Sequence, residues 1–284
     1  MTLVIHHNDL DGECSAAIVG KALGYDNIIF FSTTYDKPLP PNDLIIDNDI
    51  VIVDFSYKPT EMVELQDKCK SIIWIDHHRT AMFYPYDHIP GIRDFKDKSM
   101  AACELTWMWY FPHTKIPLIV RHIGDYDKWA HNMVGSKSFH EGAKLYYTSP
   151  DNALIWNDWL YHNITHQDII CKQVIDQGNL IVLYKDKQNK KLCDSFGYET
   201  FFHKPAYAVN QSMFSSLGFG SKIKKYPICI SYVFDGFKYI VSLYSEQVDV
   251  SEIAKMYGGG GHKGAAGFTC SKLPFERIYN DKAI

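Results

Sequence analysis

The sequence lacks the cysteine patterns of disulfide-rich and zinc-ribbon proteins. Its 284 residues include seven cysteines, an odd number, widely scattered and never spaced C-x-x-C. This distribution argues against a disulfide framework and against a zinc ribbon. Reduced, mostly structural thiols are typical of a cytosol-like compartment, so we expect a cytoplasmic protein.

Long apolar runs and long basic runs are also missing. Polar residues interrupt every apolar run well short of the roughly 20 residues that span a membrane, and the N-terminus has no signal-peptide pattern. Acidic residues number 33 against 29 basic ones, and no basic stretch is long enough to follow a nucleic-acid backbone. We therefore expect no membrane segment and no binding of long duplexes. Hydrophobic residues make up 46% of the chain, enough for one large domain or two ordinary ones.

What the first half does contain is an alternation of strand-like and helix-like segments. The strand-like runs are residues 3–7, 28–32, 50–55 and 72–75, and the helix-like segments are residues 14–23, 60–69, 99–110 and 116–129. Continuous runs rich in Ile and Val, separated by helices, are typical of a parallel sheet that is covered on both faces.

The pattern changes beyond residue 148. Residues 149–191 are helical and polar, and we expect them to form a connector that ends in an exposed charged turn at 185–191. Two strand-like runs, 228–234 and 237–244, flank Asp235-Gly236, a strong hairpin signal. The sequence therefore predicts an α/β protein: a parallel-sheet N-terminal domain (1–148), a helical connector (149–191) and a smaller α/β C-terminal domain (192–284), with the active-site cleft between the two domains.

Acids and histidines follow the ends of three predicted strands: His7, Asp9 and Asp11 after the first, Asp54 after the third, and Asp76, His77 and His78 after the fourth. In a parallel sheet these ends face one edge, where ligands bind. Clustered carboxylates repel one another, and two divalent cations would neutralise about four of them. The mixture of carboxylate and imidazole suits Mn²⁺, Fe²⁺ or Co²⁺ better than Ca²⁺. A single such aspartate is more often a turn or cap residue, but the recurrence at successive strand ends predicts a metal site.

These residues resemble the motifs of the DHH phosphoesterase superfamily. The resemblance rests on His7-Asn-Asp-Leu-Asp-Gly12, the isolated Asp54, the triplet Asp76-His77-His78, and GGGHKGAAG at residues 259–267, which is similar to the glycine-rich signature of the DHHA1 subdomain. It extends over nearly the whole chain and is closest to the stand-alone oligoribonucleases (nanoRNases) and phosphodiesterases. Arg79-Thr80-Ala81 departs from the pattern, because many relatives carry an asparagine shortly after the triplet.

The resemblance implies two divalent metal ions, Mn²⁺ first, with Mg²⁺ or Co²⁺ as alternatives. One ion would bind His7, Asp9 and Asp54. The other would bind Asp11, His77, the bridging Asp54 and an acid from a fourth motif, for which we choose Asp125 and keep Asp127 as the alternative. Asp76 would orient a ligand histidine, and His78 would face the substrate.

The resemblance also implies phosphate contacts outside the metal ligands. Gly259, Gly260 and Gly261 would present backbone N–H groups to a phosphate, and His262 would donate to the same oxygens and act with Asp76 and His78 in catalysis. A tight turn is the structural alternative for the glycines. Further candidate contacts, each with a structural alternative, are Arg79 (a surface arginine), Ser99 (a helix N-cap) and Asn210 (a turn residue).

The implied reaction is hydrolysis of short oligonucleotides or (cyclic) dinucleotides to mononucleotides, by in-line attack of a hydroxide that bridges the two ions. The mild acidity of the chain favours short substrates, since a long strand needs basic residues beyond the catalytic site. Two alternatives remain open: a nucleotide phosphomonoesterase acting on a 3′-phosphate, and a nucleotide-binding sensor without turnover. The protein would be a monomer or a homodimer.

Overall fold

The structure, a computed structural model, describes residues 1–35, 37–96, 99–161 and 163–278; of His262 only the backbone is described. The chain divides into two compact units, Met1–Val182 and Leu183–Ile284. The boundary falls within helix α8 (Ile164–Phe196), which belongs in part to each unit. Each unit has a sheet and a hydrophobic core of its own.

The first unit is built on a four-stranded parallel sheet. Its strands are β1 (Thr2–His7), β2 (Ile28–Thr33), β3 (Asp49–Val53) and β4 (Ser71–Ile75), in the order β2-β1-β3-β4. Every neighbouring pair is parallel, with Val4 of β1 opposite Phe30 of β2 and Val51 of β3. The predicted parallel sheet is therefore confirmed, with strand bounds within two residues of those expected.

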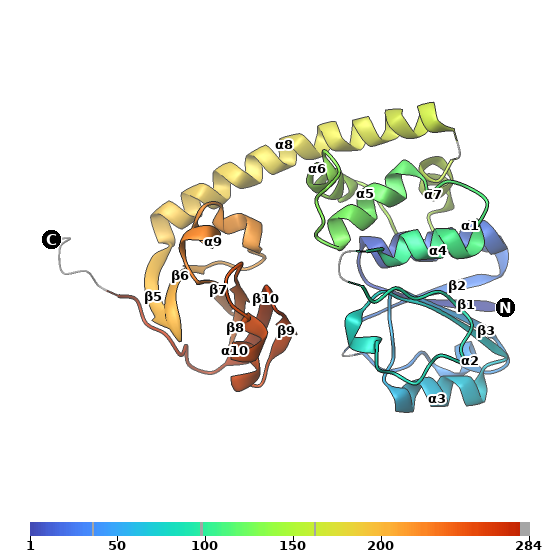
Figure 1. Ribbon diagram of the computed structural model, residues 1–284, viewed down its shortest axis with the longest axis horizontal. Coiled ribbons are helices and arrows are strands. Elements are labelled where there is room, and N and C mark those ends of the chain that lie inside the picture. Colours follow the sequence, from blue (N-terminus) through green and yellow to red (C-terminus); the bar gives the residue numbers. More distant parts are fainter. Residues whose placement is uncertain (36, 97–98, 162, 279–284) are drawn as a thin grey trace. The chain divides into compact units, whose positions relative to one another are not determined.

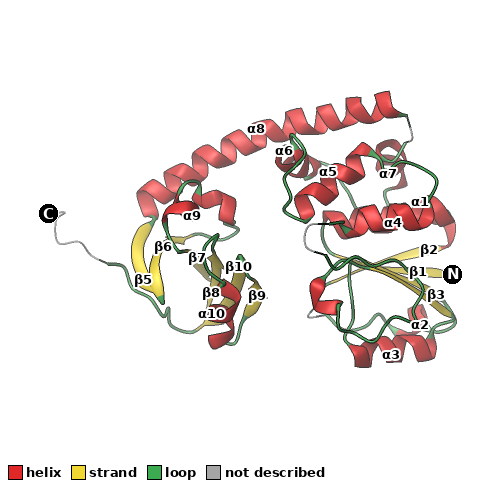
Figure 2. Cartoon of the chain, in the orientation of Figure 1, coloured by secondary structure: helices red, strands yellow, loops and turns green. Residues whose placement is uncertain are grey.

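Helices cover both faces of this sheet (Figures 1 and 2). Helices α1 (Leu10–Leu23) and α4 (Ala102–Tyr110) lie on one face, and α3 (Pro59–Lys68) and the short α2 (Asn42–Ile45) lie on the other. Alternate residues of the strands pack on opposite faces of the sheet. Val4 and Val51 belong to one core, whereas Leu3 and Ile50 belong to the other. Continuous apolar strands are required because both faces are buried.

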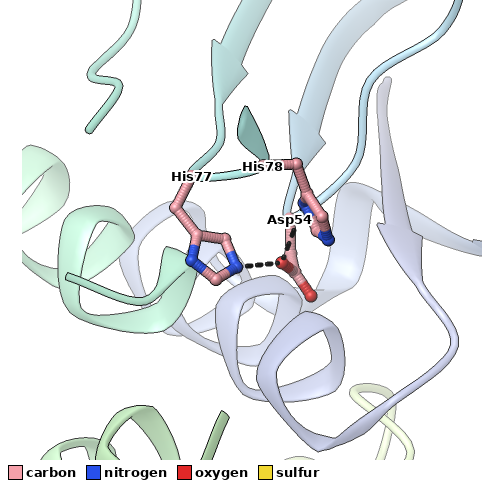
Figure 3. A group of neighbouring side chains, drawn as sticks. All are labelled: Asp54, His77 and His78. Atoms are coloured by element: carbon pink, nitrogen blue, oxygen red, sulfur yellow. Dashed lines mark ion pairs between the residues drawn. The ribbon is translucent and has the colours of Figure 1, made fainter. Parts of the chain in front are cut away.

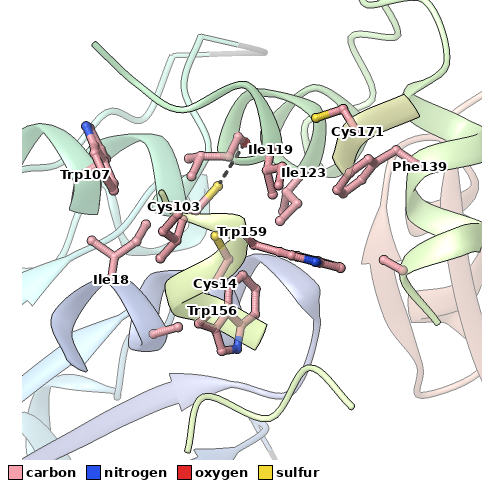
Figure 4. Close-up of a cluster of buried hydrophobic side chains, with 14 of the residues drawn as sticks. Cys14, Ile18, Cys103, Trp107, Ile119, Ile123, Phe139, Trp156, Trp159 and Cys171 are labelled. Carbon is pink, nitrogen blue, oxygen red and sulfur yellow. Dashed lines mark hydrogen bonds between the residues drawn. The ribbon is translucent and has the colours of Figure 1, made fainter. Parts of the chain in front are cut away.

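A third core lies where α1 and α4 pack against helices α5 (Leu118–Asp127), α6 (Ser136–Ala143) and α7 (Ala153–Trp159). Figure 4 shows its aromatic side chains, among them Trp107, Phe139, Trp156 and Trp159, each no more than 2% exposed. Such large buried side chains fix the orientation of α5, whose C-terminal end carries the fourth-motif acids.

Helix α1 begins at Leu10, four residues earlier than predicted. Asp9 is the reason, because its carboxylate accepts a hydrogen bond from the backbone N–H of Gly12 at 2.9 Å and so caps the helix. Gly12 is required at this position, since a Cβ there would collide with the carbonyl group of His7. The early start places Asp11 in the first helical turn.

The charged segment 185–191 is not the exposed turn that we predicted from its composition. It lies inside α8, a helix of 33 residues. Lysine and glutamine are good helix formers, and neither Gly nor Pro interrupts the helix between Gly178 and Gly197. Ion pairs between residues one turn apart also stabilise the helix. In one of them, the charged atoms of Lys190 and Asp194 are 2.6 Å apart.

The second unit is a mixed six-stranded sheet. Its strands are β5 (Tyr198–Phe202), β6 (Lys204–Asn210), β7 (Ile228–Phe234), β8 (Tyr239–Tyr244), β9 (Gly260–His262) and β10 (Ala265–Cys270), in the order β5-β6-β7-β8-β10-β9. The β6–β7 pair is parallel and the other pairs are antiparallel. The predicted β7–β8 hairpin is present: the side chain of Asp235 accepts from the N–H groups of Phe237 and Lys238.

Two short helices, α9 (Lys222–Lys225) and α10 (Val250–Met256), complete the second unit, which is the predicted smaller α/β domain. Among the described residues, no helix has the length and apolar character needed to cross a membrane.

Candidate metal centre

The carboxyl ends of the parallel strands bring the predicted acids and histidines together. His7 is the last residue of β1, Asp54 directly follows β3, and the triplet from Asp76 follows β4. Figure 3 shows both histidines of the triplet directed at Asp54: His77 Nε2 lies 3.2 Å from Asp54 Oδ1, and His78 Nδ1 lies 3.8 Å from it. The convergence expected from the strand ends is present.

Three overlapping sets of side chains have the composition and spacing of metal ligands. Within each set the ligand atoms lie within 4.8 Å of one another; the sets are His7, Asp9 and Asp54; Asp54, His77 and His78; and Asp11, His77 and Asp127. Asp54 is shared by the first two sets, and His77 by the last two. We refer to the residues of the three sets together as the metal cluster. Carboxylate and imidazole donors without thiolate suit divalent ions such as Mn²⁺, Mg²⁺ or Co²⁺.

Asp54 carries the clearest sign that a cation belongs here. Its side chain is 1% exposed, and neither carboxylate oxygen accepts a hydrogen bond from the described part of the chain. Its backbone has a φ of 55°, a left-handed conformation that is costly for a residue other than glycine. Burial, followed by the charges of Asp11 and Asp9, raises the pKa of Asp54 well above its usual value. A divalent ion would satisfy both orphaned oxygens and remove the repulsion.

The first set is organised by a short contact between His7 and Asp9. His7 Nδ1 lies 2.6 Å from Asp9 Oδ2, and 4.0 Å from Asp54 Oδ2. Burial alone would raise the pKa of Asp9, but the hydrogen bond and charge of His7, together with the N–H of Gly12, outweigh it and lower that pKa to about 2. Asp9 is therefore an anionic ligand candidate over the whole physiological pH range. His6 is buried, and its Nδ1 donates a hydrogen bond to the carbonyl oxygen of His7.

Asp11 is held by the N-terminus of α4. Its two carboxylate oxygens accept hydrogen bonds from the backbone N–H groups of Ala102 and Cys103, both at 2.9 Å. A helix N-terminus favours a negative charge, and α4 supplies two hydrogen bonds to this buried carboxylate. Asp11 Oδ2 also lies 3.7 Å from His77 Nε2, its partner in the third ligand set.

Asp76 contacts the ring of His78, the histidine expected to face the substrate, and not the ring of the expected ligand His77. The Oδ1 atom of Asp76 accepts from the N–H groups of His77 (2.8 Å) and His78 (3.2 Å), and it lies 2.8 Å from His78 Nδ1. Burial alone would lower the pKa of His78, but the charge and hydrogen bond of Asp76 outweigh it and raise that pKa to about 9.

The fourth-motif acid near the cluster is Asp127 and not Asp125, which we had preferred. Asp127 Oδ2 lies 3.4 Å from His77 Nε2, and burial raises the pKa of its carboxyl well above the usual value. Asp125 instead closes the loop after α5, accepting from the N–H groups of Asn132 (2.9 Å) and Met133 (3.1 Å). Burial alone would raise the pKa of Asp125, but hydrogen bonds from Ser136 and these N–H groups lower it.

The other predicted contacts of the first unit do not belong to the three ligand sets. Arg79 begins a short 3₁₀ turn and is exposed. Ser99 is exposed and is not the N-cap of α4, which is Ala101; the carbonyl oxygen of Ser99 accepts from Lys128. The helix needs no serine cap because Glu104 and Asp11 already accept from its first N–H groups.

The remaining candidates lie in the second unit. Asn210 is the exposed last residue of β6. Gly259 and Gly261 have a structural role at the β9–β10 pair, because a Cβ at either would collide with β10, whereas one at Gly260 would meet open space. The side chain of His262 lies outside the described residues.

Two features near the cluster were missed in the sequence. Tyr35, on the loop after β2, has its ring 5.9 Å from that of His7. Applying the strand-end argument to β2 would have indicated it, because β2 ends at the same edge of the sheet. The second feature is the ion pair of Lys128 with Glu104, residues that are far apart in the sequence and gave no local signal.

Comparison with known proteins agrees with the motifs. Residues 1–123 match the DHH family, N-terminal domain, and residues 205–280 match the DHHA1 domain. An uncharacterised protein of Acanthamoeba polyphaga mimivirus is 26% identical over 263 residues, which cover 83% of this chain and 57% of the relative. This chain thus spans little more than half the length of that relative.

Two further proteins cover most of the chain. The bifunctional oligoribonuclease and PAP phosphatase NrnA of Mycoplasma genitalium is 23% identical over 303 residues, covering 93% of this chain and 87% of the relative. The structure of a pGpG-specific phosphodiesterase of Vibrio cholerae aligns with a TM-score of 0.57 at 15% identity, covering 95% of this chain and 93% of the other, a likeness of fold. The ordered motifs, the two domain matches and the shared fold together show that the chain belongs to the DHH phosphoesterase superfamily, with a DHH domain followed by a DHHA1 domain.

Proposed function

We propose that this protein is a two-metal-dependent phosphodiesterase that hydrolyses short oligonucleotides or (cyclic) dinucleotides to mononucleotides. The observation that carries the proposal is the pair of orphaned carboxylate oxygens on buried Asp54, placed between two sets of further ligand atoms. Membership of the DHH superfamily and the activities named for NrnA and for the Vibrio cholerae phosphodiesterase support the same chemistry.

The ligands divide between two ions. His7, Asp9 and Asp54 would hold one, and Asp11, His77, Asp127 and Asp54 would hold the other. The two oxygens of Asp54 face different histidines, with Oδ2 toward His7 and Oδ1 toward His77, as a bridging ligand requires. Mn²⁺ suits this donor set, with Mg²⁺ or Co²⁺ as alternatives.

The chemistry follows from this ligand set. When bound, the two ions would neutralise the carboxylates, polarise the phosphate and activate the water that attacks phosphorus. Asp76 fixes the ring of His78 beside the cluster, where His78 is proposed to contact a phosphate oxygen. No side-chain nucleophile is needed, because the chain's part is to position and to neutralise charge.

Short substrates are favoured by the charge of the chain. The formal net charge is −4, and the sequence has no run of basic residues long enough to bind a nucleic-acid strand beyond the active site. Affinity for a long strand would have to come from such contacts, and each lost phosphate contact weakens binding.

The test is product analysis with purified protein, Mn²⁺ and a panel of short RNA, short DNA and cyclic dinucleotides, resolved by chromatography. We expect mononucleotides from a dinucleotide, and a loss of roughly a hundredfold or more in kcat/KM for His77→Ala. His113→Ala, which removes an exposed histidine from the loop after α4, is the matched control and should retain full activity. Absence of turnover by the wild type on every di- to pentanucleotide would exclude the proposal.

Phosphomonoester hydrolysis is the second candidate, favoured by the phosphatase activity in the name of NrnA. The same metal cluster could serve either reaction, since both begin with attack on phosphorus. Matched 3′-phosphorylated nucleotides and dinucleotides in the same assay separate them by the ratio of kcat/KM. A nucleotide sensor would bind Mn²⁺ and nucleotide without turnover, which a metal titration run beside the assay would reveal.

A further inference from the structure

Tyr35 lies against the metal cluster without belonging to it. It sits on the loop after β2, and its ring centroid is 5.9 Å from that of His7 and 5.9 Å from that of His78. The two histidines belong to different strand ends, so the ring spans the edge of the cluster. None of the three ligand sets includes it.

The Tyr35 ring packs against an ordered aromatic neighbour while about half of the residue stays exposed. Its centroid is 4.8 Å from that of Phe55, the residue after Asp54, which is 1% exposed and packs in turn against Tyr57 at 4.9 Å. Tyr35 itself is 54% exposed. An aromatic ring that is packed from below can contact a ligand at a low entropic cost, because it is already ordered.

A half-exposed tyrosine on a loop is in itself ordinary, since many surface aromatics have no ligand. The position is what distinguishes Tyr35: if the neighbouring ligand sets hold the metals that bind the scissile phosphate, as proposed, its ring would lie within one nucleotide of that phosphate. Aromatic rings next to phosphate sites contribute stacking energy that is insensitive to base identity, because every base has a π-face.

We infer that Tyr35 is a substrate-binding residue whose ring stacks on the nucleobase next to the phosphate held at the metal cluster. The inference rests on the proposed function for the identity of the ligand. The contact would be made by the face of the Tyr35 ring and not by its hydroxyl group. Stacking of this kind would make the site selective for nucleotides over base-free phosphate esters. Metal binding does not require this side chain.

The test compares two ligands that differ by the base. Binding of adenosine 5′-monophosphate and of ribose 5-phosphate is measured by calorimetry with Mn²⁺ for the wild type, Tyr35→Phe and Tyr35→Leu. We expect Tyr35→Leu to weaken nucleotide binding by roughly 10- to 100-fold, the usual range for one stacked base, and to leave ribose 5-phosphate within about twofold. Tyr35→Phe should retain nucleotide affinity. Tyr184→Leu, at an exposed tyrosine of α8, is the matched control and should change neither.

Three results would overturn the inference: equal losses for both ligands in Tyr35→Leu, an effect of Tyr35→Phe as large as that of Tyr35→Leu, or a wild type that binds the nucleotide no better than ribose 5-phosphate. Mn²⁺ affinity, measured on the same variants, shows whether the cluster itself is intact. The proposed function is judged separately by dinucleotide turnover. A wild type that binds the nucleotide through Tyr35 but hydrolyses no dinucleotide would refute that function and still support this inference.

Discussion

Lys128 and Glu104 form an ion pair of 2.7 Å in the first unit, with side chains only 14% and 10% exposed. The pair connects the helix end that holds Asp11 with the helix end that carries Asp127. Glu104 also accepts from the N–H of Ala101 at the start of α4, the helix end that holds Asp11, while Lys128 directly follows Asp127.

Replacing Lys128 by methionine should therefore affect both stability and metal binding. The change leaves the carboxylate of Glu104 largely buried and unpaired, which should lower the free energy of unfolding by roughly 2–4 kcal/mol. Misplacement of Asp127 should weaken Mn²⁺ binding by about 10- to 100-fold, as loss of a ligand's supporting contact does. Chemical unfolding and Mn²⁺ titration measure the two effects.

The matched control is Lys255→Met. Lys255 pairs with Glu252 at the same 2.7 Å, but both side chains are more than 60% exposed. Solvent screens an exposed pair, so this variant should be nearly neutral. Equal effects of the two substitutions would show that the Lys128 pair has no special role.

The two acids of the fourth motif should behave differently on conversion to asparagine. Asp127→Asn removes a ligand charge next to His77 and should lower kcat/KM by roughly a hundredfold or more while the fold is retained. Asp125→Asn leaves one of two loop N–H groups without an acceptor, which should cost about 1–3 kcal/mol of stability with Mn²⁺ affinity nearly unchanged. Calorimetric Mn²⁺ titration distinguishes them, and the reverse pattern would restore Asp125 as the ligand.

Asp54→Asn should stabilise the metal-free protein while abolishing its response to metal. The substitution removes a buried carboxyl whose pKa is raised by burial and by Asp11 and Asp9, so the folded state loses a repulsion. At Mn²⁺ concentrations of 100 times Kd, the wild type should gain about 5–10 °C in Tm, and the variant almost nothing. Thermal unfolding with Mn²⁺ and with EDTA decides the point. A variant with the full Mn²⁺ shift would show that Asp54 is not a ligand.

The metal-free protein should lose stability as the pH rises from about 6.5 to 9. His78 has a pKa raised to about 9 in the folded state, against about 6.5 when unfolded. Between these values the folded state retains a proton that the unfolded state has lost. The stabilisation is therefore complete below pH 6.5 and disappears by pH 9, a change of up to about 3 kcal/mol.

Urea unfolding in EDTA at pH 6.5, 7.5 and 8.5 measures this slope. His78→Gln should reduce the fall in the free energy of unfolding with pH, because glutamine does not titrate. The raised pKa values of Asp54 and Asp127 also favour lower stability at higher pH, so part of the fall should remain. A free energy of unfolding that is constant or rises over this range in the wild type would contradict the assignment of a protonated His78.

The gathering of the candidate metal ligands after the strands could be predicted because the signal is local. Apolar runs ending at His7, Asp54 and Asp76 identify strands by composition alone, and parallel strands necessarily end at one edge of their sheet. The early start of α1 was missed because capping by Asp9 depends on a single side-chain hydrogen bond. The helical state of residues 185–191 was missed because a charged composition suits both an exposed turn and an exposed helix.

By itself the sequence determined the parallel sheet, the hairpin of the second unit and the aspartates and histidines at the strand ends, because hydrophobic pattern and turn chemistry act over a few residues. Only the tertiary structure shows that Asp127 and not Asp125 lies beside His77, since residues two apart on a helix face different directions and the packing of α5 orients them. Only the tertiary structure also shows the contact of Tyr35 with His7 and the Lys128–Glu104 ion pair. In each case the two residues are distant in the sequence and come together only when the chain folds.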